Sequence, residues 1–247
     1  MTELKKQFDR DGYVAVKQFL APEQVKELQQ ETARFIREVV PTIPQQEVYY
    51  EDKADQATLK QVQQICQFDH YYEKLANSPE VVGLAQELLG GPVEIKNMQY
   101  FNKVPNIGQG TPAHQDGYYF KIMPQQAVTM WLSLCHADAE NGAVCYIPGS
   151  HLQGMRPHGS TGTLGFSQGI NDWSSADEQA ELQMVAQPGD ILVHHSLTIH
   201  RANANLSERS RQSVGFIFYR SDVVEDKAAH DEYKQQLNEK LTASGKI

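Results

Sequence analysis

Four residues in the second half of the chain combine metal-binding side chains with a cation suited to an anionic ligand. His114 and Asp116 form a His-x-Asp pair, His200 follows far downstream, and Arg211 stands eleven residues after His200. Two imidazoles and one carboxylate can occupy one face of an octahedral Fe(II) ion and leave the opposite positions open for a cosubstrate and dioxygen. An arginine fork matches a buried carboxylate. The four residues therefore predict a mononuclear iron site with a dicarboxylic cosubstrate, whose far carboxylate Arg211 would anchor.

The His-x-acid pattern alone does not select this site, because copies of it begin at His114, His136 and His230. His230 falls in a polar segment with helical character, where residues i and i+2 do not face each other. His136 would point to the same side of a predicted strand as its apolar residues. We therefore expect its side chain to pack in the core or to lie in the turn that follows. After Pro112, an extended backbone would point His114 and Asp116 to the same side, and the aromatic residues that follow could wall a cavity. Position therefore favours the copy at His114.

For the second histidine ligand, the sequence offers His194, His195 and His200. The arginine distinguishes among them. His200 and Arg211 flank the turn-rich segment 203–209, so a hairpin would bring two adjacent strands beside each other. Arg211 would also point to the same side of its predicted strand as several small residues, which places it on the face expected to line a cavity. We therefore expect His200 to complete the ligand set.

The elements that must position these residues change character near residue 92. Before it, helical patterns dominate. Apolar residues recur at roughly helical intervals over 23–40 after Pro22, and a second helix is predicted between the cap Ser78 and the stop Gly90-Gly91. We expect these helices to buttress a sheet.

From Pro92 onward, short alternating strands predominate. Strands predicted over 127–135 and 212–220 each carry bulky apolar residues on one face and smaller or polar residues on the other. Such strands suit a sandwich or jelly roll, in which one face packs and the other lines a cavity. The prediction is one mainly β domain spanning residues 1–247, with flanking helices. Its parts are a helical buttress over about 1–91, a jelly-roll core over about 92–221 and a C-terminal helix over about 225–241.

Two further segments carry weaker patterns. Residues 151–180 hold scattered glycines with little periodicity, and such a long loop within a compact domain favours an active-site lid. The C-terminal segment 225–241 carries Tyr233, Leu237 and Leu241 on one stripe, and we expect a surface helix there.

Composition limits the function classes. Lys and Arg number 22 against 31 Asp and Glu, and the net charge of -9 without a basic cluster argues against a nucleic-acid binder. No apolar run approaches the roughly 18 residues of a membrane span. The first residues are charged without an apolar segment after them, and the three cysteines lack metal or disulfide spacing. We therefore expect a cytoplasmic protein with a small-molecule partner.

Several blocks of the chain, taken together, resemble the phytanoyl-CoA dioxygenase family of Fe(II)/2-oxoglutarate oxygenases. The resemblance is ordered and correctly spaced from about Ile95 to Arg220, and the opening Phe8–Val14 is also similar to the family's start. It rests on His114-Gln-Asp116, the block Asn141–His151, Pro188-Gly-Asp190, and His195–His200 with Arg211.

The resemblance implies a double-stranded β-helix, a cupin-like jelly roll, with iron held by His114, Asp116 and His200. It also implies that 2-oxoglutarate chelates the iron while Arg211 binds its far carboxylate. The implied cofactors are Fe(II), 2-oxoglutarate and O2, and the implied reaction is hydroxylation of a C–H bond with release of succinate and CO2. Relatives that halogenate lack the carboxylate ligand, so Asp116 favours hydroxylation. Further cosubstrate contacts are expected from Gln99, Gln115, Trp131 and Lys60, or from Gln63 near Lys60.

Two alternatives remain open at this stage. The same ligands could hold zinc in a hydrolase, or the histidines could be structural in a jelly-roll binding protein without catalytic activity. Lys103 and Arg156 could indicate an acidic substrate, although a solvated charge is the more common role for either. The candidate substrate-pocket residues are Tyr118, Tyr119, Phe120, Arg156 and Trp173.

Overall fold

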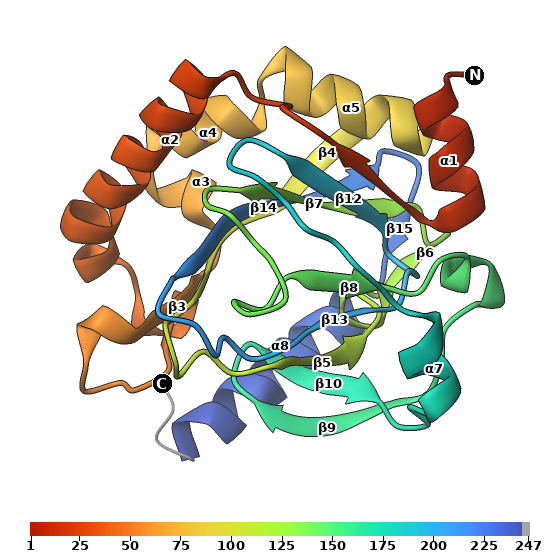
Figure 1. The fold of residues 1–247 in the computed structure, drawn as a ribbon. Helices are drawn as coiled ribbons and strands as arrows, with labels where there is room; N and C mark the ends of the chain where they lie inside the picture. Colours follow the sequence, from red (N-terminus) through yellow and green to blue (C-terminus); the bar gives the residue numbers. More distant parts are fainter. Residues whose placement is uncertain (244–247) are drawn as a thin grey trace.

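The computed structural model describes residues 1–243, except for the side chains of Lys234, Lys240 and Leu241, and it places two antiparallel sheets face to face (Figure 1). Within these residues, the larger sheet has seven strands and the smaller sheet has four. The order in the larger sheet is β1 (Tyr13–Val16), β12 (Ile191–His195), β7 (Ala127–Ser133), β14 (Arg211–Arg220), β4 (Val93–Lys103), β3 (Leu59–Val62) and β2 (Val48–Tyr50). The order in the smaller sheet is β11 (Leu182–Gln183), β8 (Val144–Tyr146), β13 (His200–Ala202) and β5 (Thr111–His114). The predicted double-stranded β-helix with flanking helices is confirmed.

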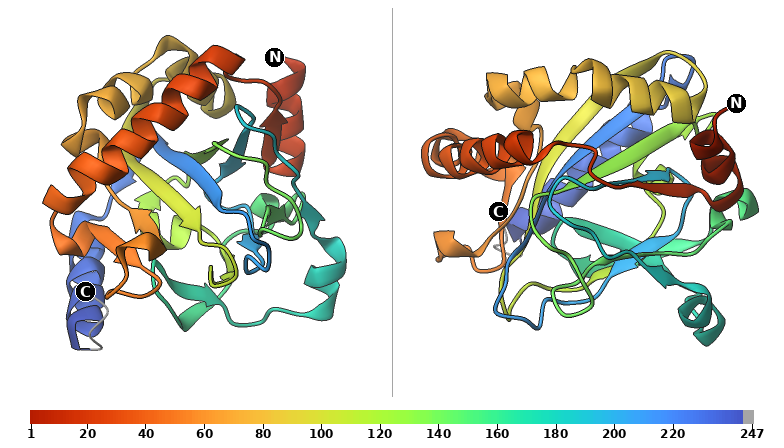
Figure 2. Two further views of the ribbon diagram at one scale, coloured as in Figure 1. Left: turned by 60° about the vertical axis from the view of Figure 1, so that its left-hand side comes forward. Right: turned by 45° about the horizontal axis from the view of Figure 1, so that its top comes forward.

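Helices cover the outer face of the larger sheet, and a hairpin lies on the opposite side of the molecule (Figure 2). The main helices are α1 (Glu3–Asp11), α2 (Pro22–Arg34), α3 (Ile65–Phe68), α4 (His70–Ala76), α5 (Pro79–Leu89) and α8 (Lys227–Ala243). Shorter elements are α6 (Gly117–Phe120), α7 (Ser175–Ala180), the hairpin β9 (His158–Thr163) and β10 (Phe166–Ile170), and the pair β6 (Ile122–Met123) and β15 (Val224–Glu225). Single turns of other helix types occur at Phe35–Val39, Val40–Thr42, Gln45–Glu47, Gln56–Thr58 and Ser150–Gln153.

The alternation predicted for the central strands determines where the core lies. In β7, Val128, Met130 and Leu132 are fully buried in the cluster shared with the helices. The intervening Thr129 and Trp131 line a cavity between the two sheets. Because successive side chains of a strand point to opposite faces, one strand supports the core and the binding site together.

Local sequence explains the ends of the main helices. Ser78 caps α5 by accepting a hydrogen bond from the backbone of Val81, and Gly90 ends the helix in the left-handed conformation that glycine adopts without strain. The regular part of α2 stops at Arg34, before the predicted limit at residue 40. A π-helical turn continues it from Phe35 to Val39, and Phe35 is fully buried.

The buttress prediction for residues 1–91 was wrong in one respect, because this region also contributes strands. Strand β1 pairs with β12, while β3 joins β4 and carries β2 at its outer edge. Strands of three or four residues are too short to show a periodic pattern. Their pairing partners are also distant in sequence, so local propensity could not reveal them.

The prediction that residues 151–180 lack regular structure was also wrong. The segment folds into the hairpin β9–β10 and the short helix α7. Gly162 and Gly165 adopt positive φ angles in the hairpin turn, so the glycines serve a tight turn between two strands. No helix within residues 1–243 is long and apolar enough to cross a membrane.

Phe216 offers a test of the core because it lies on β14 at the centre of the sheet with no exposed surface. We expect Phe216→Ala to reduce the free energy of unfolding by about 3–5 kcal/mol, since the substitution leaves a cavity under the helices. Urea denaturation measures the effect. The matched control is Leu206→Ala, at a side chain that is 78% exposed, where we expect a change within about 0.5 kcal/mol. Equal effects of the two substitutions would contradict this location of the core.

Candidate active site and metal centre

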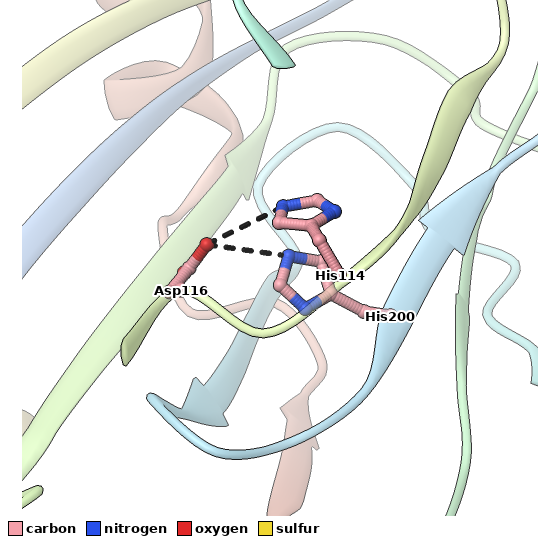
Figure 3. A group of neighbouring side chains, drawn as sticks. All are labelled: His114, Asp116 and His200. Carbon is pink, nitrogen blue, oxygen red and sulfur yellow. Dashed lines mark ion pairs between the residues drawn. The ribbon is translucent and has the colours of Figure 1, made fainter. Parts of the chain in front are cut away.

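Two adjacent strands of the smaller sheet bring the predicted ligands together. Strand β5 ends at His114, and His200, the first residue of β13, is its direct partner in the antiparallel pairing. Asp116 follows two residues after β5, at the start of α6. The Nε2 atoms of His114 and His200 lie 3.4 and 3.6 Å from the same oxygen, Oδ1 of Asp116 (Figure 3).

This cluster has the form of a metal site. One ligand atom from each of the three residues lies within 4.8 Å of the other two. His114 Nδ1 lies 2.8 Å from the carbonyl oxygen of Pro112, and His200 Nδ1 lies 3.0 Å from that of Thr198. When Nδ1 donates to a carbonyl, the Nε2 lone pair is left free for a metal. Both rings therefore present Nε2 toward Asp116 in the orientation that coordination needs.

The electrostatic surroundings favour the protonation states that bind metal. Burial, together with the neighbouring His114 and His194, lowers the pKa of His200 well below its usual range, which favours the neutral form of this imidazole. Burial opposes ionisation of Asp116, but the surrounding imidazoles of His200, His114 and His194 outweigh it and hold the pKa of Asp116 well below its usual range. A neutral imidazole and an ionised carboxylate are the forms that act as ligands.

The structure separates two of the competing histidines from the cluster. His136 pairs with Asp138 of its own motif, and its side chain is 39% exposed. His195 packs against the rings of Phe8 and His151, away from the cluster. His194 lies beside the cluster, because its ring centre is 4.1 Å from that of His200, but its Nε2 lies 3.1 Å from Oδ2, the second carboxylate oxygen of Asp116.

A cavity of about 360 Å³ adjoins the cluster, and Arg211 lies in its wall. Arg211 is 5% exposed, and its Nε has no hydrogen-bond partner among the described residues. Its guanidinium carbon lies 5.3 Å from the ring centre of Trp131. Burial lowers the pKa of Arg211 to about 10, so the group remains charged at neutral pH. A buried guanidinium without an acidic partner in residues 1–243 is suited to an anionic ligand.

Two other predicted cosubstrate residues, Gln99 and Lys60, also line this cavity. Gln99 accepts a hydrogen bond of 2.9 Å from the side chain of Gln61, and Lys60 lies 3.2 Å from a carboxylate oxygen of Glu51. Lys60 belongs to strand β3 and not to the helical region where we expected it. Gln63 lines the same cavity.

Two buried polar residues accompany Arg211 on the paired strands β4 and β14. Lys103, for which the sequence left open an acidic-substrate contact or a solvated charge, is 5% exposed, lines the cavity and pairs in register with Arg211. Burial, then repulsion from Arg211 and Lys60, lowers the pKa of Lys103 well below its usual range. Ser213 is fully buried, and its hydroxyl has no partner among the described residues. The two-residue spacing from Arg211 was the available sign that Ser213 shares its face.

The prediction for Gln115 was wrong, because this side chain does not line the cavity. It is fully buried, and its amide donates to the carbonyl oxygens of Gly154 and Leu197 while its oxygen accepts from the backbone of Arg156. In an extended segment, a residue between two inward-pointing neighbours points outward. Gln115 therefore ties the ligand segment to two neighbouring loops.

The substrate-pocket predictions divide into two groups. Tyr119 and Phe120 line the cavity. Tyr118, Arg156 and Trp173 do not, and predictions for these three were wrong. Tyr118 stacks on His158, Arg156 pairs with Asp172 and Asp177, and Trp173 lies against Arg201 and an apolar cluster around Ile199. The partners of these side chains come from distant segments, which a sequence pattern does not identify.

The C-terminal helix was predicted to lie on the surface, but it forms part of the cavity wall. His230, Tyr233 and Leu237 of α8 line the cavity, opposite residues of the β9–β10 hairpin. The hydroxyl groups of Ser167 and Tyr233 lie 2.5 Å apart and join hairpin to helix. Phe166 of the hairpin lies 5.3 Å from the ring of His114. The hairpin therefore forms part of the cavity wall, and a role of residues 151–180 as a lid stays a prediction.

Comparison with known proteins identifies the family and the fold. A family model described as phytanoyl-CoA dioxygenase (PhyH) matches residues 8–213. The peroxisomal phytanoyl-CoA dioxygenase of Bos taurus is 25% identical over 234 residues, which cover 87% of this chain and 67% of the bovine protein.

Among solved structures, the non-heme alpha-ketoglutarate-dependent carbocyclase SnoK from nogalamycin biosynthesis has a TM-score of 0.74 at 22% identity, covering 91% of this chain and 86% of SnoK. The epimerase SnoN, in complex with Fe3+, alpha-ketoglutarate and nogalamycin RO, has a TM-score of 0.73 at 22% identity, covering 90% and 84%. Both show a shared fold. The SnoN complex holds the metal and the cosubstrate expected from the present sequence.

The repeated His-x-Asp pattern supplies a matched test of the metal site. We expect His114→Ala to abolish stoichiometric Fe(II) binding, because it removes one of three protein ligands, whereas His136→Ala should leave binding unchanged. Iron content after anaerobic reconstitution and desalting measures both. Iron retained by His114→Ala, or lost equally in both variants, would contradict the proposed ligand set.

Proposed function

Since the chain belongs to the phytanoyl-CoA dioxygenase family, we propose that it hydroxylates a C–H bond of a small molecule with Fe(II), 2-oxoglutarate and O2, releasing succinate and CO2. The observation that carries this proposal is one cavity that contains both a cluster of two histidines and a carboxylate and a buried arginine without an acidic partner among the described residues. The first feature suits iron, and the second suits the far carboxylate of a dicarboxylic acid.

The protein's contribution is to hold and orient the reactants. His114, Asp116 and His200 would hold the metal on one face, and Arg211 would hold the far carboxylate of 2-oxoglutarate, beside the ring of Trp131. When bound, iron and 2-oxoglutarate supply the oxidising chemistry. The β9–β10 hairpin and α8 close over the cavity and limit the access of water to the reacting groups.

The presence of Asp116 supports hydroxylation as the outcome. A family halogenase needs the coordination position that this carboxylate would occupy, so a halide would have no place beside the metal here. Structural relatives include a carbocyclase and an epimerase, so the shared fold serves more than one oxidative outcome. The outcome in this chain depends on which substrate bond lies nearest the metal.

The part of the cavity beyond the metal cluster supports a substrate that is uncharged where it contacts the protein. Tyr119, Phe120 and Tyr219 provide aromatic surface there, and Asn97 adds an amide group. Among the described side chains, the lysine in this part of the lining is Lys96, which is already paired with Glu94 and Glu225, at 3.1 and 2.6 Å. A charged substrate group would have to displace one of these ion pairs.

The two alternatives explain less of the site. A zinc hydrolase would use the same three ligands but would leave the buried Arg211 without a role. A binding protein without a metal would leave two imidazoles and one carboxylate pointing at one another without a purpose. Binding of 2-oxoglutarate therefore separates the proposed enzyme from both.

We expect Arg211→Met to weaken 2-oxoglutarate binding by about 30-fold or more, which corresponds to roughly 2 kcal/mol for a buried charge pair that loses one partner. Calorimetric titration of the anaerobic Fe(II) protein measures this affinity. Fe(II) binding should persist in the variant. The control is Arg209→Met, in the exposed turn, which should bind 2-oxoglutarate as tightly as the unaltered protein. Unchanged affinity in Arg211→Met would show that the cosubstrate anchor lies elsewhere.

We expect the Fe(II) protein to release succinate faster in the presence of its substrate and to incorporate one oxygen atom from isotopically labelled O2 into the product. A metabolite screen for stimulated succinate release identifies the substrate, and mass spectrometry measures the label. Asp116→Ala is the inactive control. A product without labelled oxygen would contradict hydroxylation while leaving 2-oxoglutarate-dependent oxidation intact.

A further inference from the structure

The two oxygens of the Asp116 carboxylate have different surroundings. Oδ1 faces the Nε2 atoms of His114 and His200. Oδ2 accepts a hydrogen bond of 2.5 Å from the hydroxyl of Thr129 and lies 3.1 Å from Nε2 of His194. One oxygen is thus directed at the predicted ligand atoms, whereas the other is held by two side chains outside the ligand set.

The two side chains that hold Oδ2 come from the larger sheet. Thr129 on β7 and His194 on β12 are direct partners in the antiparallel pairing of these strands. Both histidine ligands belong to strands β5 and β13 of the smaller sheet. Asp116 therefore lies between the two sheets, with one oxygen turned to each.

The orientation of His194 is fixed by its neighbours. Its side chain is 4% exposed, and its Nδ1 lies 2.9 Å from the hydroxyl of Tyr146. In the tautomer that carries its hydrogen on Nε2, His194 donates to Oδ2 of Asp116 through Nε2 and accepts from the hydroxyl of Tyr146 through Nδ1. Tyr146 is fully buried and stacks on Tyr13 at a ring distance of 4.7 Å. This chain of contacts holds the imidazole as a donor to Asp116.

The difference between the two oxygens matters because of the number of coordination positions. An octahedral ion has about six positions, of which two imidazoles and a carboxylate bound through one oxygen take three. A chelating 2-oxo acid takes two more and leaves one for O2. A carboxylate bound through both oxygens would occupy that last position. Holding Oδ2 away from the metal therefore keeps the site able to react.

We propose that Thr129 and His194 form a carboxylate clamp: two positioning residues that restrict Asp116 to coordination through Oδ1 and so keep one position on the metal open. The clamp rests on the proposed function, because it presupposes a metal held by Asp116. His194 acts through Asp116 and is not itself a metal ligand. The closely spaced group of ligand atoms within the described residues consists of His114, Asp116 and His200.

The test uses Co(II) in place of iron, since binding and the visible absorption spectrum of Co(II) report affinity and coordination number without turnover. We expect Thr129→Val and His194→Gln each to raise the dissociation constant for Co(II) by about 10-fold or more, as for other residues that hold metal ligands in place. Both should also shift the Co(II) spectrum. Because the two residues hold the same oxygen, the double variant should lose less than the product of the single effects.

Conservative variants separate positioning from a general loss of structure. Thr129→Ser retains the hydroxyl and should restore both the affinity and the spectrum, while Tyr146→Phe, which removes only the hydrogen bond to His194, should produce a smaller change of the same kind. His195→Gln is the matched control, because this neighbouring histidine does not touch Asp116 and should leave Co(II) binding unchanged.

Three results would overturn the clamp. Unaltered Co(II) affinity and spectrum in both Thr129→Val and His194→Gln would show that the hydrogen bonds to Oδ2 do not control coordination. Complete loss of Co(II) binding in His194→Gln, equal to that in His114→Ala, would make His194 a ligand. Failure of the unaltered protein to bind Co(II) or Fe(II) would overturn the proposed function and the clamp together, whereas the first two results leave the proposed function in place.

Discussion

The pairing of β5 with β13 is the constraint on which the rest of the site depends. It sets His200 directly opposite His114, although 86 residues separate them in the chain. A shift of that register by one residue would turn one imidazole to the other face of the sheet and destroy the ligand set. Asp116 lies just beyond the paired strands and reaches across to the larger sheet, where the hydroxyl of Thr129 donates a hydrogen bond to its carboxylate. The proposed metal centre therefore lies at a junction between the two sheets.

The larger sheet serves two purposes through the alternation of its side chains. Its outward-facing residues, such as Met130 and Phe216, are buried against the helices. Its inward-facing residues, such as Trp131 and Arg211, line the cavity. A charged guanidinium removed from water without a partner is energetically unfavourable. The favourable free energy of burying the apolar outward-facing residues offsets this desolvation of Arg211. The apolar core therefore stabilises a fold that contains a buried anion-binding site.

Charge is distributed unevenly along the cavity. At one end Lys60 is paired with Glu51, whereas Arg211 has no acidic partner among the described residues, so positive charge exceeds negative charge there. Farther along, Lys96 is balanced by two glutamates. An excess of buried positive charge favours a dicarboxylic cosubstrate at one end, and a balanced, aromatic wall favours an uncharged group at the other.

The sequence by itself determined the fold class, the two-faced strands and the identity of the ligand candidates, because alternation, caps and turn residues act over a few neighbouring positions. It also suggested Arg211 as the anchor for an anionic ligand, because this residue follows a turn and shares a strand face with small residues. It did not determine the direction of Gln115, the burial of Lys103 or the contact between His194 and Asp116. These depend on side chains brought together from strands and loops far apart in the chain, so no local pattern encodes them. Only the tertiary structure decided which of several histidines meet at one carboxylate, because strand register and the packing of two sheets fix distances that sequence spacing leaves free.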